Sequence, residues 1–487
     1  MGCRCGLVLV AGVIAGCGGA EASSATGARA GPDGGKPQTN EAEPVVSGSR
    51  LRARWQVADQ AQRLVGWHDD KLGLDCGFEG NVFPQRRHAC LPSVAEVSSY
   101  FSDPSCTVPV SVAESDCATT KPLYAAEGGG DCASEPTFFA IGESLNGKVY
   151  TMEKDSCVAH GDGSSVDLHA LGAAVPASTF VVATETHDDA GQMWLATDDG
   201  ARVPWGGWDG TRAVQPTLAE DGTMRWAPWY VWQAGQNDYA DPTCTVPAAR
   251  PVLPGQCQPD AVLSSGMGVP PPPEQCGGPR ASFLSIGARV DTSYAKIGTS
   301  CVAQPQSPGA DVWLAGAAIP ADTLLSSGDV RAGAGRVQVQ YATLRGHPIR
   351  QTSPQLGSYG EPVPDTFVDV TSGLPCQPSA AADGKVRCMP VPEVEVAFAD
   401  AQCTQPVVEL PSCGAGAPSI VTLVKYSGST CIATTIHGYA VVGSPTQVFG
   451  FDPDGCRALY VPGGLTPYAL GPELPAEKFV EVTEKVD

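Results

Sequence analysis

The chain has 487 residues, of which 57 are Gly, 43 are Pro and 19 are Cys, and only 17% are charged. Its 30 basic residues stand against 52 acidic ones, and the net charge of −22 argues against nucleic-acid binding, which needs a positively charged surface. With 42% hydrophobic residues the chain can bury a core, and its cysteine content is too low for a small protein held together by disulfides alone. Composition therefore names no activity.

The N-terminus resembles the export signal of bacterial lipoproteins. An apolar run over residues 7–14 precedes Ala15, Gly16 and Cys17. The run is shorter than the about 20 apolar residues that a membrane-spanning helix needs. The resemblance implies a signal peptide over residues 1–16 and lipidation of Cys17, so the membrane is an expected partner through the lipid anchor. The alternative is an ordinary signal peptide that leaves Cys17 as a thiol.

The segment after the signal has the composition of a tether. Residues 18–48 contain no aromatic side chain and are rich in Ala, Gly, Ser, Pro and Glu. Such a sequence cannot bury enough apolar surface to offset the entropy lost on ordering. We expect residues 17–48 to be a flexible tether that typically reaches about 30 Å.

Three parts of the chain repeat one pattern, which is typical of a repeat architecture. In each, two cysteines stand 25 residues apart, and a proline follows the second cysteine after 19 residues. The positions are Cys132, Cys157 and Pro176, then Cys276, Cys301 and Pro320, then Cys431, Cys456 and Pro475. An Asp-x-x-Cys-Thr element precedes them, starting at Asp103, Asp241 and Asp400, and we interpret these aspartates as turn caps. The predicted copies are residues 49–190, 191–334 and 335–487.

The cysteines of the three copies predict a set of disulfides. Copies one and three have six cysteines each, whereas copy two lacks the first two and has Val214 and Trp226 in their places. The loss of both at once indicates that these two form a bridge, so we predict contact between Val214 and Trp226. For the rest, pairing of sequence neighbours is the simplest choice, although four cysteines allow three connectivities. The predicted bridges are Cys76–Cys90, Cys376–Cys388, Cys106–Cys117, Cys132–Cys157, Cys244–Cys257, Cys276–Cys301, Cys403–Cys413 and Cys431–Cys456. We expect no metal site, because no cysteine pair has the spacing of a zinc knuckle.

Short apolar runs between Gly, Pro and Asp predict an all-β fold. Residues 180–183 and 193–196 flank a polar turn, which predicts a hairpin across the boundary of copies one and two. Pairing of the last strand, residues 479–482, with the first, residues 51–55, would close a ring and cover both exposed edges. We therefore predict a three-copy, β-propeller-like ring stapled by disulfides. Three abutting β-sandwich domains are the alternative.

The lipoprotein signal and the recurring Asp-x-x-Cys-Thr element together resemble uncharacterised cysteine-rich repeat lipoproteins of myxobacteria-like bacteria. The resemblance covers residues 1–17 and the three copies. It implies an exported, membrane-anchored protein and carries no activity with it.

Two groups of residues break the repeat and are candidates for chemistry. Five histidines lie in copy one, where they are able to bind a metal or to act as bases beside a carboxylate: His68, His88, His160, His169 and His187. Copy two gathers tryptophans, of which four form a candidate ligand platform: Trp205, Trp208, Trp229 and Trp232. The structural alternatives are solvated turns for the histidines and core filling for the tryptophans.

No nucleophile elbow, phosphate loop or zinc-protease helix is present in the sequence. We therefore expect a non-enzymatic binding or interaction protein, lipid-anchored in the bacterial envelope at the outer membrane or cell surface, with a glycan or protein ligand. No cofactor and no nucleic-acid partner are expected. The alternatives are a secreted polysaccharide- or peptide-degrading hydrolase or lyase on a propeller, and a structural component of the envelope.

Overall fold

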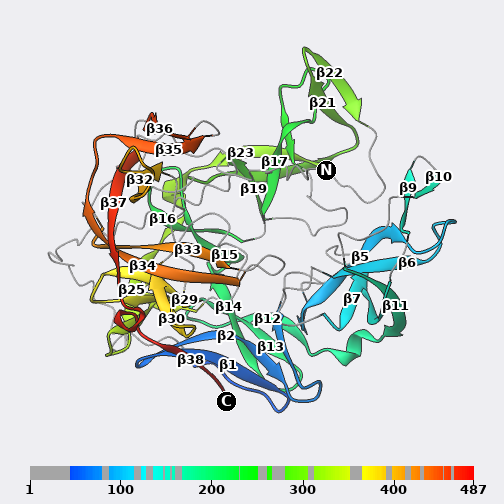
Figure 1. The fold of residues 1–487 in the computed structure, drawn as a ribbon. Coiled ribbons are helices and arrows are strands. Elements are labelled where there is room, and N and C mark those ends of the chain that lie inside the picture. Colours follow the sequence, from blue (N-terminus) through cyan, green and yellow to red (C-terminus); the bar gives the residue numbers. More distant parts are fainter. Residues whose placement is uncertain are drawn as a thin grey trace, which may run out of the picture.

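A computed structural model shows an all-β protein whose strands form five sheets (Figure 1). It describes residues 44–78, 87–113, 122–127, 135–145, 148–153, 156–159, 167–229, 231–249, 260–265, 280–304, 312–350, 365–390, 397–411, 418–427, 433–452, 455–461 and 465–487. The predicted signal peptide, Cys17 and nearly all of the predicted tether lie outside these residues.

Each copy begins with an antiparallel meander, and the meanders form the inner body. In copy one, Leu51, Ala53 and Trp55 of the first strand alternate with partly exposed residues and face the core, as the period of a half-buried strand requires. The strands are β1 (Leu51–Ala58), β2 (Ala61–Asp69), β3 (Leu74–Phe78) and β4 (Arg87–Leu91) in copy one, then β13 (Gln192–Thr197), β14 (Arg202–Trp208), β15 (Ala213–Leu218) and β16 (Met224–Pro228) in copy two. Copy three contributes β26 (Val337–Leu344), β27 (His347–Ile349), β28 (Thr366–Asp369), β29 (Leu374–Ala380) and β30 (Val386–Pro390).

Linker strands join each meander to the next. β12 (Val182–His187) pairs with β4 and with β13, so the hairpin predicted across the first boundary is present. β24 (Leu325–Ser326) pairs with β16, and β25 (Gly328–Ala332) pairs with β26. β38 (Val482–Val486) pairs with β1, and Glu481 just before it bridges to Arg387 of β30. The last strand therefore lies beside the first, as predicted, although residues 482–486 pair with residues 54–58 rather than 479–482 with 51–55.

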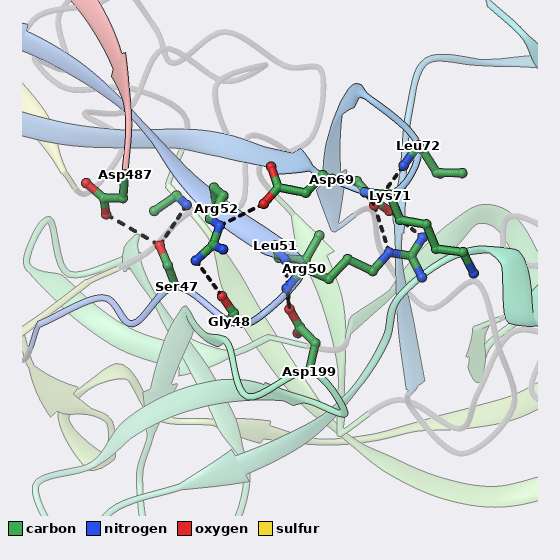
Figure 2. Close-up of polar contacts among 12 residues, drawn as sticks. Ser47, Gly48, Arg50, Leu51, Arg52, Asp69, Lys71, Leu72, Asp199 and Asp487 are labelled. Carbon is green, nitrogen blue, oxygen red and sulfur yellow. Dashed lines mark hydrogen bonds and ion pairs between the residues drawn. The ribbon is translucent and has the colours of Figure 1, made fainter.

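Polar contacts fix the segment that enters β1 against copy two and against the C-terminal residue (Figure 2). The backbone amides of Arg50 and Leu51 donate to Asp199 Oδ2 at 2.9 and 2.7 Å. The guanidinium of Arg50 donates from Nε to Oδ1 of the fully buried Asp69 at 2.7 Å. Ser47 Oγ donates to Asp487 Oδ2 at 3.4 Å, which places the C-terminal residue beside the segment that enters β1.

After its meander, each copy forms an outer sheet of seven strands that ends in a 3-10 turn. In all three copies this turn directly follows the repeating proline: η2 (Ala177–Thr179), η3 (Ala321–Thr323) and η5 (Ala476–Lys478). The strands of copy one are β5 (Val94–Phe101), β6 (Pro109–Ala113), β7 (Tyr124–Glu127), β8 (Thr137–Ser144), β9 (Tyr150–Glu153), β10 (Ser156–Ala159) and β11 (Asp167–Val175). Those of copy two are β17 (Val231–Tyr239), β18 (Pro247–Ala249), β19 (Ala261–Ser265), β20 (Ser282–Val290), β21 (Ser293–Ile297), β22 (Ser300–Gln304) and β23 (Val312–Ile319). Copy three has β31 (Ala397–Phe398), β32 (Pro406–Pro411), β33 (Ile420–Ser427), β34 (Ala433–Gly443), β35 (Val448–Asp452), β36 (Gly455–Leu459) and β37 (Leu465–Glu473).

The predicted β-propeller is not found among the described strands. Each copy divides its strands between an inner meander and a separate outer sheet, and the meanders of copies one and two belong to one eleven-stranded sheet while that of copy three belongs to another sheet. The outer sheets agree with the alternative of several sandwich-like domains, one in each copy.

Five disulfides join described residues, and three of them correct the sequence prediction. Cys76–Cys90 and Cys376–Cys388 form as expected from their joint absence in copy two. The other bridges are Cys106–Cys157, Cys244–Cys301 and Cys403–Cys456, which exclude the predicted pairs Cys106–Cys117, Cys132–Cys157, Cys244–Cys257, Cys276–Cys301, Cys403–Cys413 and Cys431–Cys456. The reason is strand register, because β9 pairs with the end of β5 and so brings the β9–β10 hairpin beside the turn that holds Cys106. The partner cysteines of the excluded pairs lie outside the described residues: Cys117, Cys132, Cys257, Cys276, Cys413 and Cys431.

Candidate functional site

The histidines of copy one lie apart from one another. His68 on β2 contacts Asp75 at 2.8 Å, and His88 on β4 is fully buried, with Nε2 2.9 Å from Glu185. His169 lies on the outer sheet, His187 stacks on the Trp208 ring with centroids 4.5 Å apart, and His160 lies outside the described residues. Within the described part of the chain no group of three or more His, Cys, Asp or Glu is placed to hold a metal ion. The hypothesis of a shared histidine site therefore fails for the four histidines described.

The three described tryptophans of the predicted ligand platform pack on a core cluster, which favours the alternative of core filling. Trp205 is 3% exposed, and its ring packs 5.6 Å from that of Trp229. Trp208 and Trp229 are partly buried against the same core cluster. The side chain of Trp232 lies outside the described residues. The large rings are needed here because β13 and β14 pack on β1 and β2 across the junction of copies one and two.

The repeating aspartates cap turns, as predicted. Asp103 accepts hydrogen bonds from the backbone amides of Ser105, Thr107 and Val108 at 2.7–3.1 Å. Desolvation raises the pKa of the Asp103 carboxyl, but the hydrogen bonds, led by that from Val108, outweigh it and hold the pKa well below its usual value. The turn forces the following cysteine into the left-handed region, with φ 52° at Cys106, 52° at Cys244 and 54° at Cys403.

Each capped turn is tied by a disulfide to a projecting hairpin. These three outer hairpins are β9–β10, β21–β22 and β35–β36, and their bridging residues are Cys157, Cys301 and Cys456. Figure 1 shows the three hairpins at the periphery, on the side away from β1 and β38. Because an isolated two-stranded hairpin is marginally stable in water, the disulfide supplies a constraint that the small hairpin core cannot.

Exposed apolar side chains gather on these hairpins and the turns beside them. Among the described residues, fifteen large hydrophobic side chains are exposed, and nine of them lie here. The most exposed are Tyr460 at 86%, Phe451 at 72% and Ile297 at 62%. The others are Val108, Met152, Val158, Val246, Val302 and Leu459. The nine side chains are divided three to each copy, so each hairpin with its turn presents a small exposed apolar group.

Sequence reasoning overlooked this surface. The signal was present, because Val158 and Val302 each directly follow the bridging cysteine of a short strand, in hairpins too small to bury both faces. The sequence prediction considered only residues that differ between the copies, whereas exposed apolar side chains occur on the equivalent hairpin of all three copies.

Comparison with known proteins finds a similarity for one part of the chain only. No curated protein and no solved structure matches it. In the described part of the chain, no helix has the length and apolar character needed to cross a membrane. Residues 39–178, which include most of copy one, match the model of a family of unknown function (DUF7481), to which this part of the chain is similar.

Proposed function

We propose that the protein is an interaction protein that binds a protein partner through its three outer hairpins. The observation that carries this proposal is the gathering of nine exposed apolar side chains on three disulfide-anchored hairpins and their adjoining turns. The disulfides restrict the hairpins before binding, so less conformational entropy is lost when a partner docks.

A protein partner suits this surface better than a glycan. Seven of the nine exposed side chains are not aromatic and bind by apolar packing, and only Phe451 and Tyr460 in copy three have rings able to stack on sugars. The tryptophans that would suit a sugar pack into the core instead. Because the surface occurs three times, a partner that engages more than one hairpin gains avidity.

The proposed location is the bacterial envelope, with a lipid on Cys17 as the anchor. The five disulfides are typical of an oxidising, extracytoplasmic compartment and support export. Metabolic labelling with an alkynyl fatty acid tests the anchor, because the lipid signal must disappear in Cys17→Ser.

Crosslinking in cells tests the binding role. A photoreactive amino acid at Ile297, and separately at Phe451, is expected to capture one and the same protein, identified by mass spectrometry. Replacing Ile297, Phe451 and Met152 together with serine is expected to weaken binding of that protein by about 10²–10⁴-fold if the hairpins act jointly.

The matched control replaces exposed valines elsewhere, Val370→Ser and Val486→Ser, which are 43% and 50% exposed and lie outside the hairpins. These variants should bind as tightly as the unmodified protein. Equal loss of binding in control and hairpin variants would contradict the proposal, and so would selective binding to a glycan array with no captured protein.

A further inference from the structure

Copy three carries a hydrogen-bonded relay of three side chains on the face of its outer sheet. Thr435 and His437 are two residues apart on strand β34, so their side chains project from the same face of the sheet. Thr435 Oγ1 lies 2.9 Å from His437 Nε2, and His437 Nδ1 lies 2.7 Å from Glu473 Oε1. A hydroxyl on one imidazole nitrogen and a carboxylate on the other is the arrangement that activates a hydroxyl nucleophile.

The relay is absent from the equivalent positions of the other copies. In copy three, Tyr439 is paired with Glu473. The corresponding pairs are Phe139 with Ala174 in copy one and Leu284 with Ala318 in copy two. The positions of Thr435, His437 and Glu473 therefore hold Glu135, Thr137 and Ala174 in copy one, and Arg280, Ser282 and Ala318 in copy two. The fold needs none of the three relay side chains at these positions, because both other copies form the same sheet without them.

The carboxylate at the end of the relay is itself held in place. Lys425 Nζ donates to Glu473 Oε2 at 3.0 Å, and the Tyr439 hydroxyl donates to the same oxygen at 3.4 Å. Desolvation raises the pKa of Glu473, but the bonds with His437 and Lys425 outweigh it and keep that pKa below its usual value, so the group is a carboxylate. Lys425 lies on β33 directly opposite Thr435, and its Nζ is held at Glu473.

From this geometry we propose that copy three is an acyl-transfer centre that hydrolyses carboxylic esters, with Thr435 as nucleophile and His437 as base. Thr435 Oγ1 forms a bond to the ester carbonyl carbon while its proton passes to His437 Nε2. The carbon–oxygen bond to the alcohol then breaks, and the alcohol leaves with that proton. Water attacks the acyl-threonine, gives a proton to His437, and releases the acid as Thr435 regains its hydrogen.

The remaining side chains have positioning roles. Glu473 fixes the ring so that Nε2 faces the hydroxyl, and Lys425 in turn holds the Glu473 carboxylate in place. The site lies on an open sheet face, with the His437 side chain 13% and the Glu473 side chain 36% exposed.

Hydrolysis of p-nitrophenyl acetate by the full mature chain tests the proposal. Thr435→Val keeps the shape of the side chain and removes the hydroxyl, so it should lower kcat/KM by at least about 10²-fold. Thr435→Ser keeps the hydroxyl and should retain activity. A fluorophosphonate probe should label the peptide that contains residue 435, and the label should be absent in Thr435→Val.

Controls separate the relay from folding and from the proposed binding role. Thr434→Val changes the neighbouring residue, which faces the other side of β34, and should leave the rate unchanged. Glu473→Ala introduces the residue found in the other two copies, so it should fold normally while losing most of the activity. Equal rates for Thr435→Val and the unmodified chain would overturn the inference, as would labelling at any other residue. The serine variants of the outer hairpins should not alter the rate, so either proposal can fail alone.

Discussion

Copy two and copy three fill the same space in the inner body with different side chains. In copy three, Cys376 is opposite Pro390 and Pro378 is opposite Cys388, and in copy two the same register places Val214 opposite Pro228 and Pro216 opposite Trp226. Val214 and Trp226 are buried in one core cluster, which confirms the contact predicted from the missing cysteines.

A third position changes together with these two. This position is Gly207 in copy two, which pairs with Val214. The equivalent residues are Phe367, paired with Cys376 in copy three, and Trp67, paired with Cys76 in copy one. A Cβ atom on Gly207 would stand 2.6 Å from the Trp226 ring, so the glycine makes room for that ring. Each meander thus buries one large aromatic ring at this level, on either of two strands. The disulfide is present in the copies where the ring lies on the strand that precedes the first cysteine, as Trp67 and Phe367 do. In copy two the ring of Trp226 takes the place of the second cysteine, and no bridge forms there.

The largest expected effect follows from removing the ring of copy two. Trp226 is 1% exposed, and its indole Nε1 donates to the Thr343 carbonyl in copy three at 2.8 Å. Trp226→Ala should lower the free energy of unfolding by about 3–5 kcal/mol, because it opens a cavity and leaves that carbonyl unpaired. Urea denaturation followed by tryptophan fluorescence and circular dichroism measures the change. Trp208→Ala is the control, since Trp208 is only partly buried, and a loss as large there would show that the site is not special.

Removing the bridge of copy three should have the next largest effect. The double variant Cys376→Ala, Cys388→Ala should lower the free energy of unfolding by about 2–4 kcal/mol, since the unfolded chain regains the freedom that the bridge removes. A more specific test imports the pattern of copy two, with Phe367→Gly, Cys376→Val and Cys388→Trp. The triple variant should be more stable than the alanine pair, and no difference between them would contradict the interchange of ring and bridge.

A smaller effect is expected from crowding the glycine of copy two. Gly207→Ala places a methyl group against the Trp226 ring and should cost about 1–3 kcal/mol of stability. The cost should largely disappear in the double variant with Trp226→Val, because the ring that causes the clash is gone. Additive losses in the double-mutant cycle would show that the two positions are independent.

The sequence contained enough to predict the repeat, the strands and the first bridge of copies one and three, because these depend on spacing and on paired loss. It did not contain the pairing of Cys106 with Cys157. That bond depends on β9 returning to β5, a contact between strands that lie far apart in the chain. Neighbour pairing assumed that short loops close locally, and the intervening strands prevent this.

The candidate sites were missed for a related reason. The search for residues that break the repeat pointed to copy one, where many histidines occur, yet the relay has a single histidine, in copy three. Its signal was Glu473, two residues before the repeating Pro475, where the other copies have Ala174 and Ala318 at the same distance from their prolines, and this change is visible in the sequence itself. The number of histidines in a copy was therefore a poorer guide than a simultaneous change at facing positions.

The smallest effect concerns the capped turns that all three copies share, and it depends on pH. Hydrogen bonds, first that of Thr243 and then that of the Val246 amide, hold the pKa of Asp241 well below its usual value. Because the pKa is lower in the folded chain, this carboxylate adds stability above the unfolded pKa of about 3.9, and that stability is lost as the pH falls further. The urea midpoint should therefore fall as the pH is lowered from 5 to about 2, and Asp241→Asn should lower the midpoint at pH 5 and flatten this dependence. Asp322→Asn alters an exposed aspartate of the same copy and should leave the slope unchanged. An equal slope in Asp241→Asn and the unmodified chain would show that the cap orders the turn without making it sensitive to acid.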